Sequence, residues 1–473
     1  GEGSFNKALF FTLPMDLFYR KSTTREVTHY GWSPLTKNAG QRVATGSLYN
    51  VVISAPENLE AVRGKSWSIP KIFSGFGIKP KNRQWSIHGY ATNNFNILKL
   101  SKNINKEYLF SKDNNLLKFS KIGIEKESLR VLNSRISNKP HDSDLFGSPL
   151  LNKFITTDFS ESLLEFITPP YKEHKKTLKF LDSVHQNVSN KFSKEILWPL
   201  SMPPFIDKDS NIPIAYYGNS DEALFKKVYR NGLSNRYGRQ MQTIAGIHYN
   251  YSLDDELLTR LFSKYSKIDY KEKNTIYFGA LRNLLRFNWL LLFLFGASPF
   301  VSKNIVGKND SRFYKLDEKT FFMPFATSLR MSDIGYQNTK QSDLDISFNS
   351  VEHYIKGLRK ATKTHSKYFE NISHIKGQEY PQINSNILQI EDEYYSTSRP
   401  KSSMESDNRM INKLDKYGVN YIELRSIDLN PFQSTGIDIE TMQFLEIFIL
   451  YCMFKPSPKI SKSRMSDIRK NDL

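Results

Sequence analysis

The stretch GIEKESLRV, Gly123 to Val131, decides the fold class, because it alternates as a β-strand does and carries two acids on one side. Residues two apart in a strand point to the same face of a sheet, so Glu125 and Glu127 lie side by side. Like charges at this spacing repel unless a positive group lies between them, and a divalent cation is the natural candidate. A solvated strand edge, offset by Lys126 and Arg130, is the alternative that this stretch leaves open.

Three further segments alternate with period two and predict more strands of the same kind: IHYNYS (247–252), ILQIEDEYY (387–395) and YIELRSIDLNPF (421–432). Their polar sides carry His248, Asn250, Gln389, Glu391, Glu393, Tyr395, Glu423 and Arg425. Alternation of this kind indicates an antiparallel sheet with one polar face. That face is unusually rich in carboxylates and poor in lysine.

Helical signals lie between these strands. A capping pattern at Asp158 and Glu161 predicts a helix over 159–167, which the proline pair 169–170 would end. Apolar residues at helical spacing predict a helix over 172–192, and the apolar stretch 274–295 predicts a long, buried one. The sequence therefore combines helices with an antiparallel sheet.

Composition indicates a globular, intracellular chain. The sequence has 473 residues, 39% of them hydrophobic, and its one cysteine, Cys452, excludes an intramolecular disulfide and is expected to be a buried residue in a reducing, cytoplasmic compartment. The longest uninterrupted apolar run, 289–297, is short against the roughly 20 residues that a membrane helix needs, so we expect no membrane span. The apolar run near the start lacks a clear cleavage site, and we expect no secretion signal.

Positive charge gathers at the two ends. The formal net charge is +19, and residues 1–97 hold 12 Lys/Arg against 5 Asp/Glu, while residues 455–473 hold 6 against 2. The middle lacks the long basic block of a nucleic-acid surface, so we expect no nucleic-acid partner. The alternative is a non-catalytic basic binder that acts through the ends of the chain, with a steep salt dependence.

The acidic side chains predict a site for Mg²⁺ or Mn²⁺, since oxygen ligands with at most one histidine and no thiolate suit these ions better than zinc. Such ions beside Arg425 suit phosphoryl transfer, and no P-loop motif occurs. Each residue also has a simpler interpretation: Asp158 as a helix cap, His248 as a hydrogen-bonded structural histidine, and Glu423 with Arg425 as an ion pair. Glu165 lies in an apolar run, where an acid seldom lies without a partner.

Eight motifs in fixed order resemble the proteobacterial-type glutamate–cysteine ligases over about residues 98–454. They are GIEKESLRV, FITTDFSESLLEFITPP, LWPLSMPP, YRNGLSNRYGRQMQTIAGIHYNYS, LFGASP, ATSLRMSDIGYQN, INSNILQIEDEYY and YIELRSIDLNPF. The resemblance implies an α+β fold related to glutamine synthetase, in which an antiparallel sheet curves into a funnel with helices outside. It also implies a reaction of ATP, L-glutamate and L-cysteine that gives γ-glutamylcysteine, ADP and phosphate, the first step of glutathione synthesis.

The resemblance further implies roles for individual residues. Metal-site residues are Glu125, Glu127, Asp158, Glu165, His248 and Glu423. Arg425 meets the ATP phosphates, Arg330 holds a substrate carboxylate, and Gln242 and Asn250 lie near the glutamate. The wall around the cysteine side chain is made by Tyr229, Tyr336, Tyr395 and Phe159, for which the alternative is plain core packing.

Two departures from the family define the expected domains. Residues 1–97 match nothing in the family and form an unassigned N-terminal extension, while 98–454 form the catalytic domain. Chains of the family continue beyond the last apolar helix, so this domain is expected to be truncated at its C-terminus, with 455–473 as a solvated basic tail. A related ligase with another amine acceptor, or an inactive truncated homologue, is therefore the alternative to a working enzyme.

Overall fold

The computed structural model of the chain describes residues 78–81, 84–87, 104–105, 119–263, 267–306, 310–335, 341, 344–375, 377, 379–403 and 409–471. The chain divides into two compact units, one of residues 1–101 with 293–295 and one of residues 102–292 with 296–473. In the first unit, β1 (Ile78–Lys81) and β2 (Gln84–Ile87) pair as an antiparallel hairpin. Apart from the first two residues of LFGASP, the motifs that predict function lie in the second unit, whose fold is described next.

An open antiparallel sheet forms the centre of the second unit, with strand order β12, β13, β8, β3, β6, β5. The strands are β12 (Ser398–Lys401), β13 (Tyr421–Ile427), β8 (Ile247–Leu253), β3 (Ser120–Leu132), β6 (Leu163–Ile167) and β5 (Ile155–Thr157). Two short strands, β4 (Arg135–Ile136) and β7 (Ile196–Leu197), pair with the far end of β3. The strands predicted over 123–131, 247–252 and the first part of 421–432 are confirmed.

The two faces of this sheet differ as the alternation predicts. Strand register sets Glu125 opposite His248, and Glu127 opposite Glu165, so these residues share one face. Ile124 lies opposite Tyr249 on the other face, with both side chains fully buried. The interpretation of β3 as a solvated edge is wrong, because β3 is a central strand on which even Lys126 is buried.

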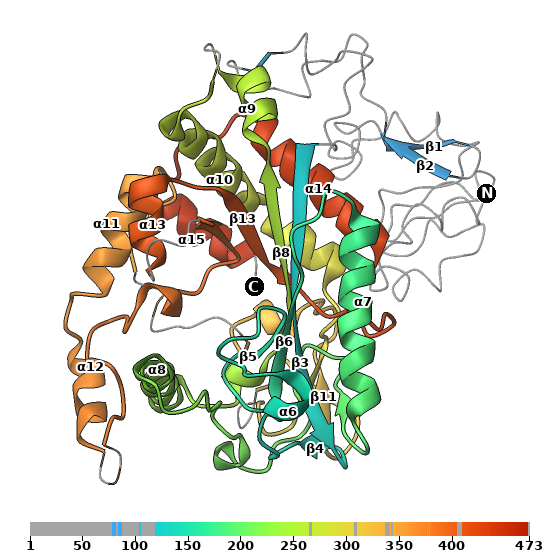
Figure 1. Ribbon diagram of the computed structural model, residues 1–473, viewed down its shortest axis with the longest axis vertical. Helices are drawn as coiled ribbons and strands as arrows, with labels where there is room; N and C mark the ends of the chain where they lie inside the picture. Colours follow the sequence, from blue (N-terminus) through green and yellow to red (C-terminus); the bar gives the residue numbers. More distant parts are fainter. Residues whose placement is uncertain are drawn as a thin grey trace. The chain divides into compact units, whose positions relative to one another are not determined.

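Two helices cover the apolar face. α7 (His174–Lys191) packs on β3 and β6 and contacts α14 (Ile439–Phe454), as the ribbon shows (Figure 1). The Tyr249 hydroxyl donates to the Met442 carbonyl at 3.1 Å, and the Thr177 hydroxyl donates to the Ile122 carbonyl at 3.2 Å. These helices pack against the face of the sheet opposite the acidic side chains.

The remaining elements surround the sheet. They are α6 (Ser143–Phe146), α8 (Asp221–Tyr237), α9 (Asp255–Phe262), α10 (Tyr270–Phe295), α11 (Val351–Ala361), α12 (Lys367–Glu370), α13 (Met410–Tyr417) and α15 (Lys462–Asn471), with a small sheet of β9 (Phe300–Ser302), β10 (Tyr314–Lys315) and β11 (Thr320–Phe322). The predicted helices over 172–192 and 274–295 are present as α7 and α10. By length and composition α10 could cross a membrane, but 72% of its apolar window is buried inside the protein, as in a core helix.

The helix predicted over 159–167 is wrong, because this segment forms the turn and second strand of the β5–β6 hairpin. Its capping signal is used differently: the Glu161 carboxylate accepts from the backbone N–H groups of His141 and Tyr216, each at 2.6 Å. The alternating run 163–167 pairs along its length with β3. Long-range pairing therefore outweighs a local helix signal of a few residues.

The strand predicted over 387–395 is also wrong, since the segment is irregular with a 3₁₀ turn at Glu391–Glu393. Its acids point to different partners: Glu391 pairs with Arg409 at 2.7 Å, and Glu393 pairs with Arg236 at 3.0 Å. The alternation in this short segment therefore does not reflect a strand. Because its acids form separate ion pairs, Gln389, Glu391 and Glu393 do not belong to the acidic face.

The segment predicted as a solvated tail contains α15 and is partly docked, which that interpretation did not anticipate. Ile460 and Ile468 are buried, and Arg286 donates to the Pro458 carbonyl. Cys452 is fully buried, as expected, and burial raises the pKa of its thiol. The proposed boundaries at residues 97 and 454 stay predictions.

Breaking the buried pair of Arg236 and Glu393 should cost much stability. Both side chains are fully buried, and the Arg236 guanidinium also donates to the Asn384 and Asn386 carbonyls, which ties α8 to the 382–393 segment. Since Arg236→Leu leaves the carboxylate buried and unpaired, we expect it to lower the free energy of unfolding by about 3–5 kcal/mol. Urea denaturation of the full chain measures this loss.

The control is Arg359→Ala, which removes an exposed ion pair with Asp415 at 2.7 Å and should cost less than about 1 kcal/mol. The double substitution Arg236→Leu with Glu393→Leu should recover much of the loss. A cost for Arg236→Leu no larger than that of the control contradicts the prediction.

Candidate active site

Acidic side chains from three strands meet on the polar face beside one histidine. Ligand atoms of Glu125 (β3), Glu165 (β6) and His248 (β8) all lie within 4.8 Å of one another, a group that could hold a metal ion. The His248 Nδ1 lies 3.1 Å from Glu125 Oε2, and Asn250 Nδ2 donates to Glu125 Oε1 at 2.8 Å. Neighbouring strands thus place four residues predicted from distant motifs in one cluster.

Two more of the predicted carboxylates belong to this cluster. The Nε2 of His248 lies 3.7 Å from Glu127 Oε1, and its Nδ1 lies 3.8 Å from Glu423 Oε1. Glu127 is fixed because the Gly246 N–H donates to its Oε2 at 2.9 Å. His248 therefore lies among three carboxylates at once, and its side chain is 5% exposed.

The surroundings of these carboxylates shift their pKa values in different directions. Burial and the charges of Glu125, Asp158 and Glu127 raise the pKa of Glu165 well above its usual range. Burial also raises the pKa of Glu127, against the opposing charge of His248. Burial would raise the pKa of Glu125, but its hydrogen bond with His248 and the charges of His248 and Lys401 together lower it. The cluster thus holds more potential negative charge than its own cations neutralise.

Unpartnered acceptors point to the same need for a cation. Within the described part of the chain, Glu423 Oε2 and Asn250 Oδ1 are buried and accept no hydrogen bond. Leaving such atoms unsatisfied is costly. Carboxylate and amide oxygens with one imidazole suit Mg²⁺ or Mn²⁺, so the residues present fit the predicted ion.

Cationic side chains border the cluster on the β12 side. Arg425 Nη1 donates to Glu423 Oε1 at 3.1 Å, and its side chain is 16% exposed. Lys401, which the sequence analysis missed, lies with its Nζ 3.5 Å from the same oxygen. Although burial opposes it, the charges of Lys401, Arg425 and His248 lower the pKa of Glu423. Alternation of Arg399 and Lys401 in 398–401 was the signal that could have found them.

Arg330 is buried at the edge of the site, and its guanidinium is closely surrounded by neighbouring residues. Its Nη2 donates to the Arg425 carbonyl at 2.8 Å, and its Nη1 lies 3.8 Å from the carboxylate of Asp428, a residue that the sequence analysis also missed. A Cβ at Gly246 would come within 2.1 Å of the Arg330 guanidinium, so only glycine leaves room for it. Asp428 in turn accepts from the Ser298 hydroxyl at 2.6 Å and the Ala297 N–H at 2.9 Å.

The predicted substrate-contacting residues fall into two groups. Gln242 Nε2 donates to the Tyr395 hydroxyl at 3.2 Å, and burial raises the pKa of Tyr229 well above its usual range. Phe159 is 1% exposed, in an apolar cluster against which Tyr229 packs. Gln242 and Tyr395 are thus in contact, and Tyr229 packs against the cluster that holds Phe159, whose burial fits core packing as well as a pocket wall.

Two further residues, Asp158 and Tyr336, were predicted to belong to the site but are not part of the groups described above. The Asp158 carboxylate acts electrostatically on Glu127 and Glu165, although it is not part of the three-residue metal group. Its backbone carbonyl accepts from Arg230 Nε at 2.6 Å. Tyr336 lies outside the described residues.

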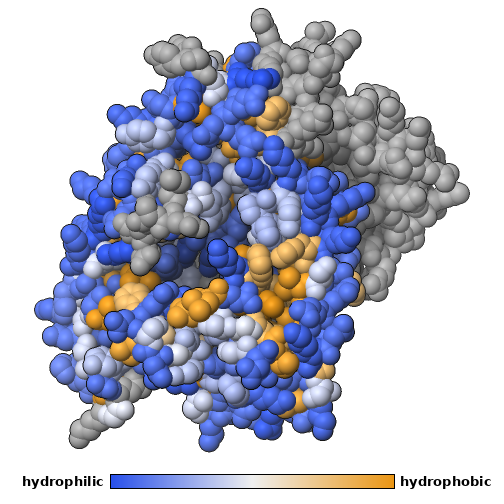
Figure 2. All heavy atoms as spheres, viewed as in Figure 1, coloured by the Kyte–Doolittle hydropathy of each residue, from blue (hydrophilic) through white to orange (hydrophobic). Residues whose placement is uncertain are grey.

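Figure 2 shows a hollow near the centre of the viewed face, where hydrophilic residues gather.

Together, the open antiparallel sheet, the carboxylate cluster and the bordering arginines form a site that could hold a divalent cation beside anionic groups. Comparison with known proteins makes this specific. The family model "Glutamate-cysteine ligase" matches residues 107–473. The glutamate–cysteine ligase of Aliivibrio salmonicida is 43% identical over 347 residues, which are 73% of this chain and 66% of that protein. The enzyme of the same name from Pseudomonas putida is 44% identical over 362 residues, 76% of this chain and 69% of that protein.

Solved structures agree. The glutamate–cysteine ligase of Francisella tularensis in complex with AMP matches with a TM-score of 0.70 and 38% identity, over 75% of this chain and 70% of that one. A bifunctional glutathione synthetase from Pasteurella multocida matches with a TM-score of 0.57 and 28% identity, over 75% of this chain and 41% of that one. The chain belongs to the glutamate–cysteine ligase family, and the predicted fold class is confirmed.

The family match covers only part of this chain, and the chain covers only part of its relatives. It spans about two thirds of the length of the curated relatives, from 66% to 69% for the two named here. Residues 1–54 match a different family model, "Exopolysaccharide biosynthesis protein YbjH". The family match begins at residue 107, so residues 1–54 are similar to something other than the ligases.

Proposed function

We propose that the chain catalyses the ATP-dependent joining of L-glutamate, through its γ-carboxylate, to L-cysteine, giving γ-glutamylcysteine, ADP and phosphate in the first step of glutathione biosynthesis. The observation that carries the proposal is the convergence of Glu125, Glu165 and His248 from three strands, in a chain of this family. The AMP bound in the Francisella tularensis structure supports a nucleotide as co-substrate. We place this activity in the cytoplasm, as the sequence predicts.

The reaction needs two transfers. In the first, a γ-carboxylate oxygen of glutamate attacks the terminal phosphorus of ATP, and the bond from that phosphorus to the bridging oxygen breaks, releasing ADP. In the second, the cysteine nitrogen attacks the acyl carbon, phosphate leaves, and the nitrogen loses a proton. Both steps move negative charge between oxygens, so positioning and charge neutralisation are the enzyme's main tasks.

The residues of the site suit these tasks. The metal ligands in our proposal are Glu125, Glu127, Asp158, Glu165, His248 and Glu423; Mg²⁺ or Mn²⁺ held there would neutralise phosphate oxygens. Arg425 would contact the ATP phosphates, and the fork of Arg330 suits a substrate carboxylate. Gln242 and Asn250 would contact glutamate, and Tyr229, Tyr395, Phe159 and Tyr336 would surround the cysteine side chain. Lys401 and Arg425 keep Glu423 ionised.

The test is release of phosphate from ATP by the full chain, with each substrate omitted in turn. We expect release only when glutamate, cysteine and Mg²⁺ are all present, with one γ-glutamylcysteine formed per phosphate. Equal release with cysteine omitted contradicts the proposal, and so does an absence of release in the complete mixture.

A ligase for another amine acceptor is the second candidate, and it concerns the same site. An apolar pocket separates close analogues by only about 10- to 200-fold, so the acceptor must be measured. Turnover with cysteine, 2-aminobutyrate and alanine at equal concentration decides it. Cysteine should be the best acceptor if Tyr229 and Tyr395 enclose its side chain.

A further inference from the structure

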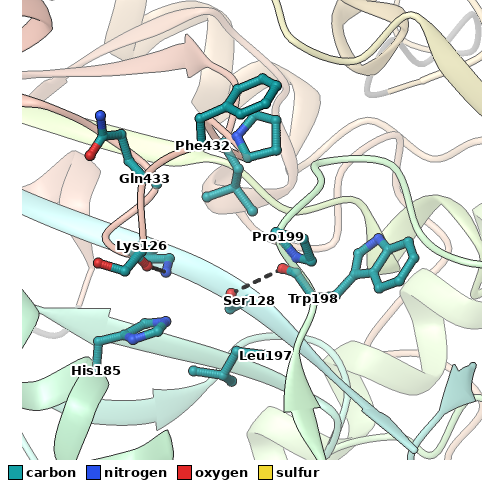
Figure 3. A pocket seen from close by; sticks show the side chains of 12 residues that line it. Lys126, Ser128, His185, Leu197, Trp198, Pro199, Phe432 and Gln433 are labelled. Carbon is teal, nitrogen blue, oxygen red and sulfur yellow. Dashed lines mark hydrogen bonds between the residues drawn. The ribbon is translucent and has the colours of Figure 1, made fainter. Parts of the chain in front are cut away.

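A cavity lies on the face of the sheet opposite the acidic cluster. It measures about 190 Å³ and lies between β3, α7, the 197–199 segment and the 429–436 loop. Lys126 and Ser128 line it from β3, where they alternate with Glu125 and Glu127 and so face away from the cluster. Figure 3 shows their side chains with those of His185 and Gln433 around the open space.

Two of the eight motifs supply six of the twelve lining residues. Leu197, Trp198 and Pro199 come from LWPLSMPP, and Leu429, Pro431 and Phe432 come from YIELRSIDLNPF. The proposed ligase site uses neither group. The first supplies an apolar wall, from which the Trp198 indole points away, and the second a wall that ends in the 70% exposed Phe432 (Figure 3).

The polar side chains that line the cavity can form further hydrogen bonds. Lys126 is 3% exposed, and its Nζ donates to the Ser434 carbonyl at 2.8 Å. Burial lowers the pKa of Lys126 to about 7. Its ammonium form has three donors, and in the described part of the chain it forms no ion pair with a carboxylate. Lysine is seldom buried unless it is paired. Within the same described ranges, His185 contacts the Phe166 ring edge-on but has no hydrogen-bond partner.

The shape and chemistry select one class of ligand. An apolar cavity of about 150 Å³ can hold benzene, so this one has room for a body of that size. One buried ammonium with apolar walls suits a single carboxylate on an apolar body, oriented by a few polar groups. We infer that the cavity is a binding site for a small organic monocarboxylate, separate from the ligase site on the other face.

Benzoate is the probe, and benzyl alcohol is its uncharged counterpart of nearly equal size. Isothermal titration of the full chain should show saturable binding of benzoate and binding of benzyl alcohol that is at least tenfold weaker. Lys126→Met keeps the buried stem but removes the charge, and should weaken benzoate binding at least tenfold. Lys121→Met on the same strand removes a half-exposed lysine paired with Asp254 and should leave binding unchanged.

A second variant tests the inference independently, in case Lys126→Met does not fold. Leu197→Trp fills the space from a half-buried position at the end of β7, and should abolish binding of benzoate. Saturating ATP, Mg²⁺ and glutamate should not compete, and this result is independent of whether the chain is an active ligase. The inference is overturned if benzoate shows no saturable binding up to its solubility limit, if ATP or glutamate displaces it, or if Leu197→Trp binds it as well as the parent chain does.

Discussion

Replacing Arg425 with alanine should lower the rate of phosphate release by about 10³- to 10⁵-fold, the range seen when an arginine that neutralises transferred phosphoryl oxygens is lost. Arg425 suits that role because it borders the acidic cluster from β13, with its guanidinium 3.1 Å from Glu423 Oε1 and its side chain partly exposed. The measurement is kcat for ADP formation at saturating ATP, glutamate, cysteine and Mg²⁺.

Two controls separate charge from geometry and from folding. Arg425→Lys keeps the charge but loses the planar fork, so it should recover only part of the rate. Arg312→Ala removes an arginine that pairs with Asp310 and Asp333 away from the cluster, and should leave the rate unchanged. If Arg425→Ala loses less than tenfold while thermal unfolding is unchanged, Arg425 does not contact the reacting phosphate.

Replacing Glu165 with glutamine should have two effects of opposite sign. The Mg²⁺ concentration for half-maximal activity should rise at least 10- to 100-fold, since even groups that only support metal ligands cost about that much when lost. Without metal, the variant should be more stable at pH 7, because the raised pKa of Glu165 means that its ionisation in the folded protein costs stability. Chelation of divalent ions should abolish the activity of the parent chain.

The matched control is Glu446→Gln, which neutralises a buried carboxylate on the apolar face, where Glu446 lies 3.0 Å from His174. It should leave the Mg²⁺ dependence unchanged. Activity titrated against Mg²⁺ and urea unfolding in EDTA give the two readouts. A structural role for Glu165 predicts the reverse pattern, with lost stability and an unaltered Mg²⁺ requirement.

The missing hydrogen bonds of the cluster explain why these two effects should be large. Glu423 Oε2 and Asn250 Oδ1 have no donor in the described part of the chain, and the neighbouring carboxylates repel one another. A divalent ion would relieve both costs at once. Removing a ligand therefore affects metal affinity more than packing.

The sequence by itself determined the strands that carry the site and the face on which the acids lie. Alternation is a local property, so Glu125 with Glu127, His248 with Asn250, and Glu423 with Arg425 were predicted correctly to share a face of their own strands. The motifs also determined the family, because their order and length are specific.

Only the tertiary structure decided how these strands meet and what else lies beside them. The 159–167 segment became a hairpin because pairing with β3 outweighed its local helix signal, and 387–395 became irregular because Glu391 and Glu393 pair with arginines distant in sequence. The burial of Lys126 and the position of Lys401 beside Glu423 likewise depend on neighbours far along the chain. Local patterns fix the direction of a side chain, but its partners follow from strand register and packing, which no short stretch encodes.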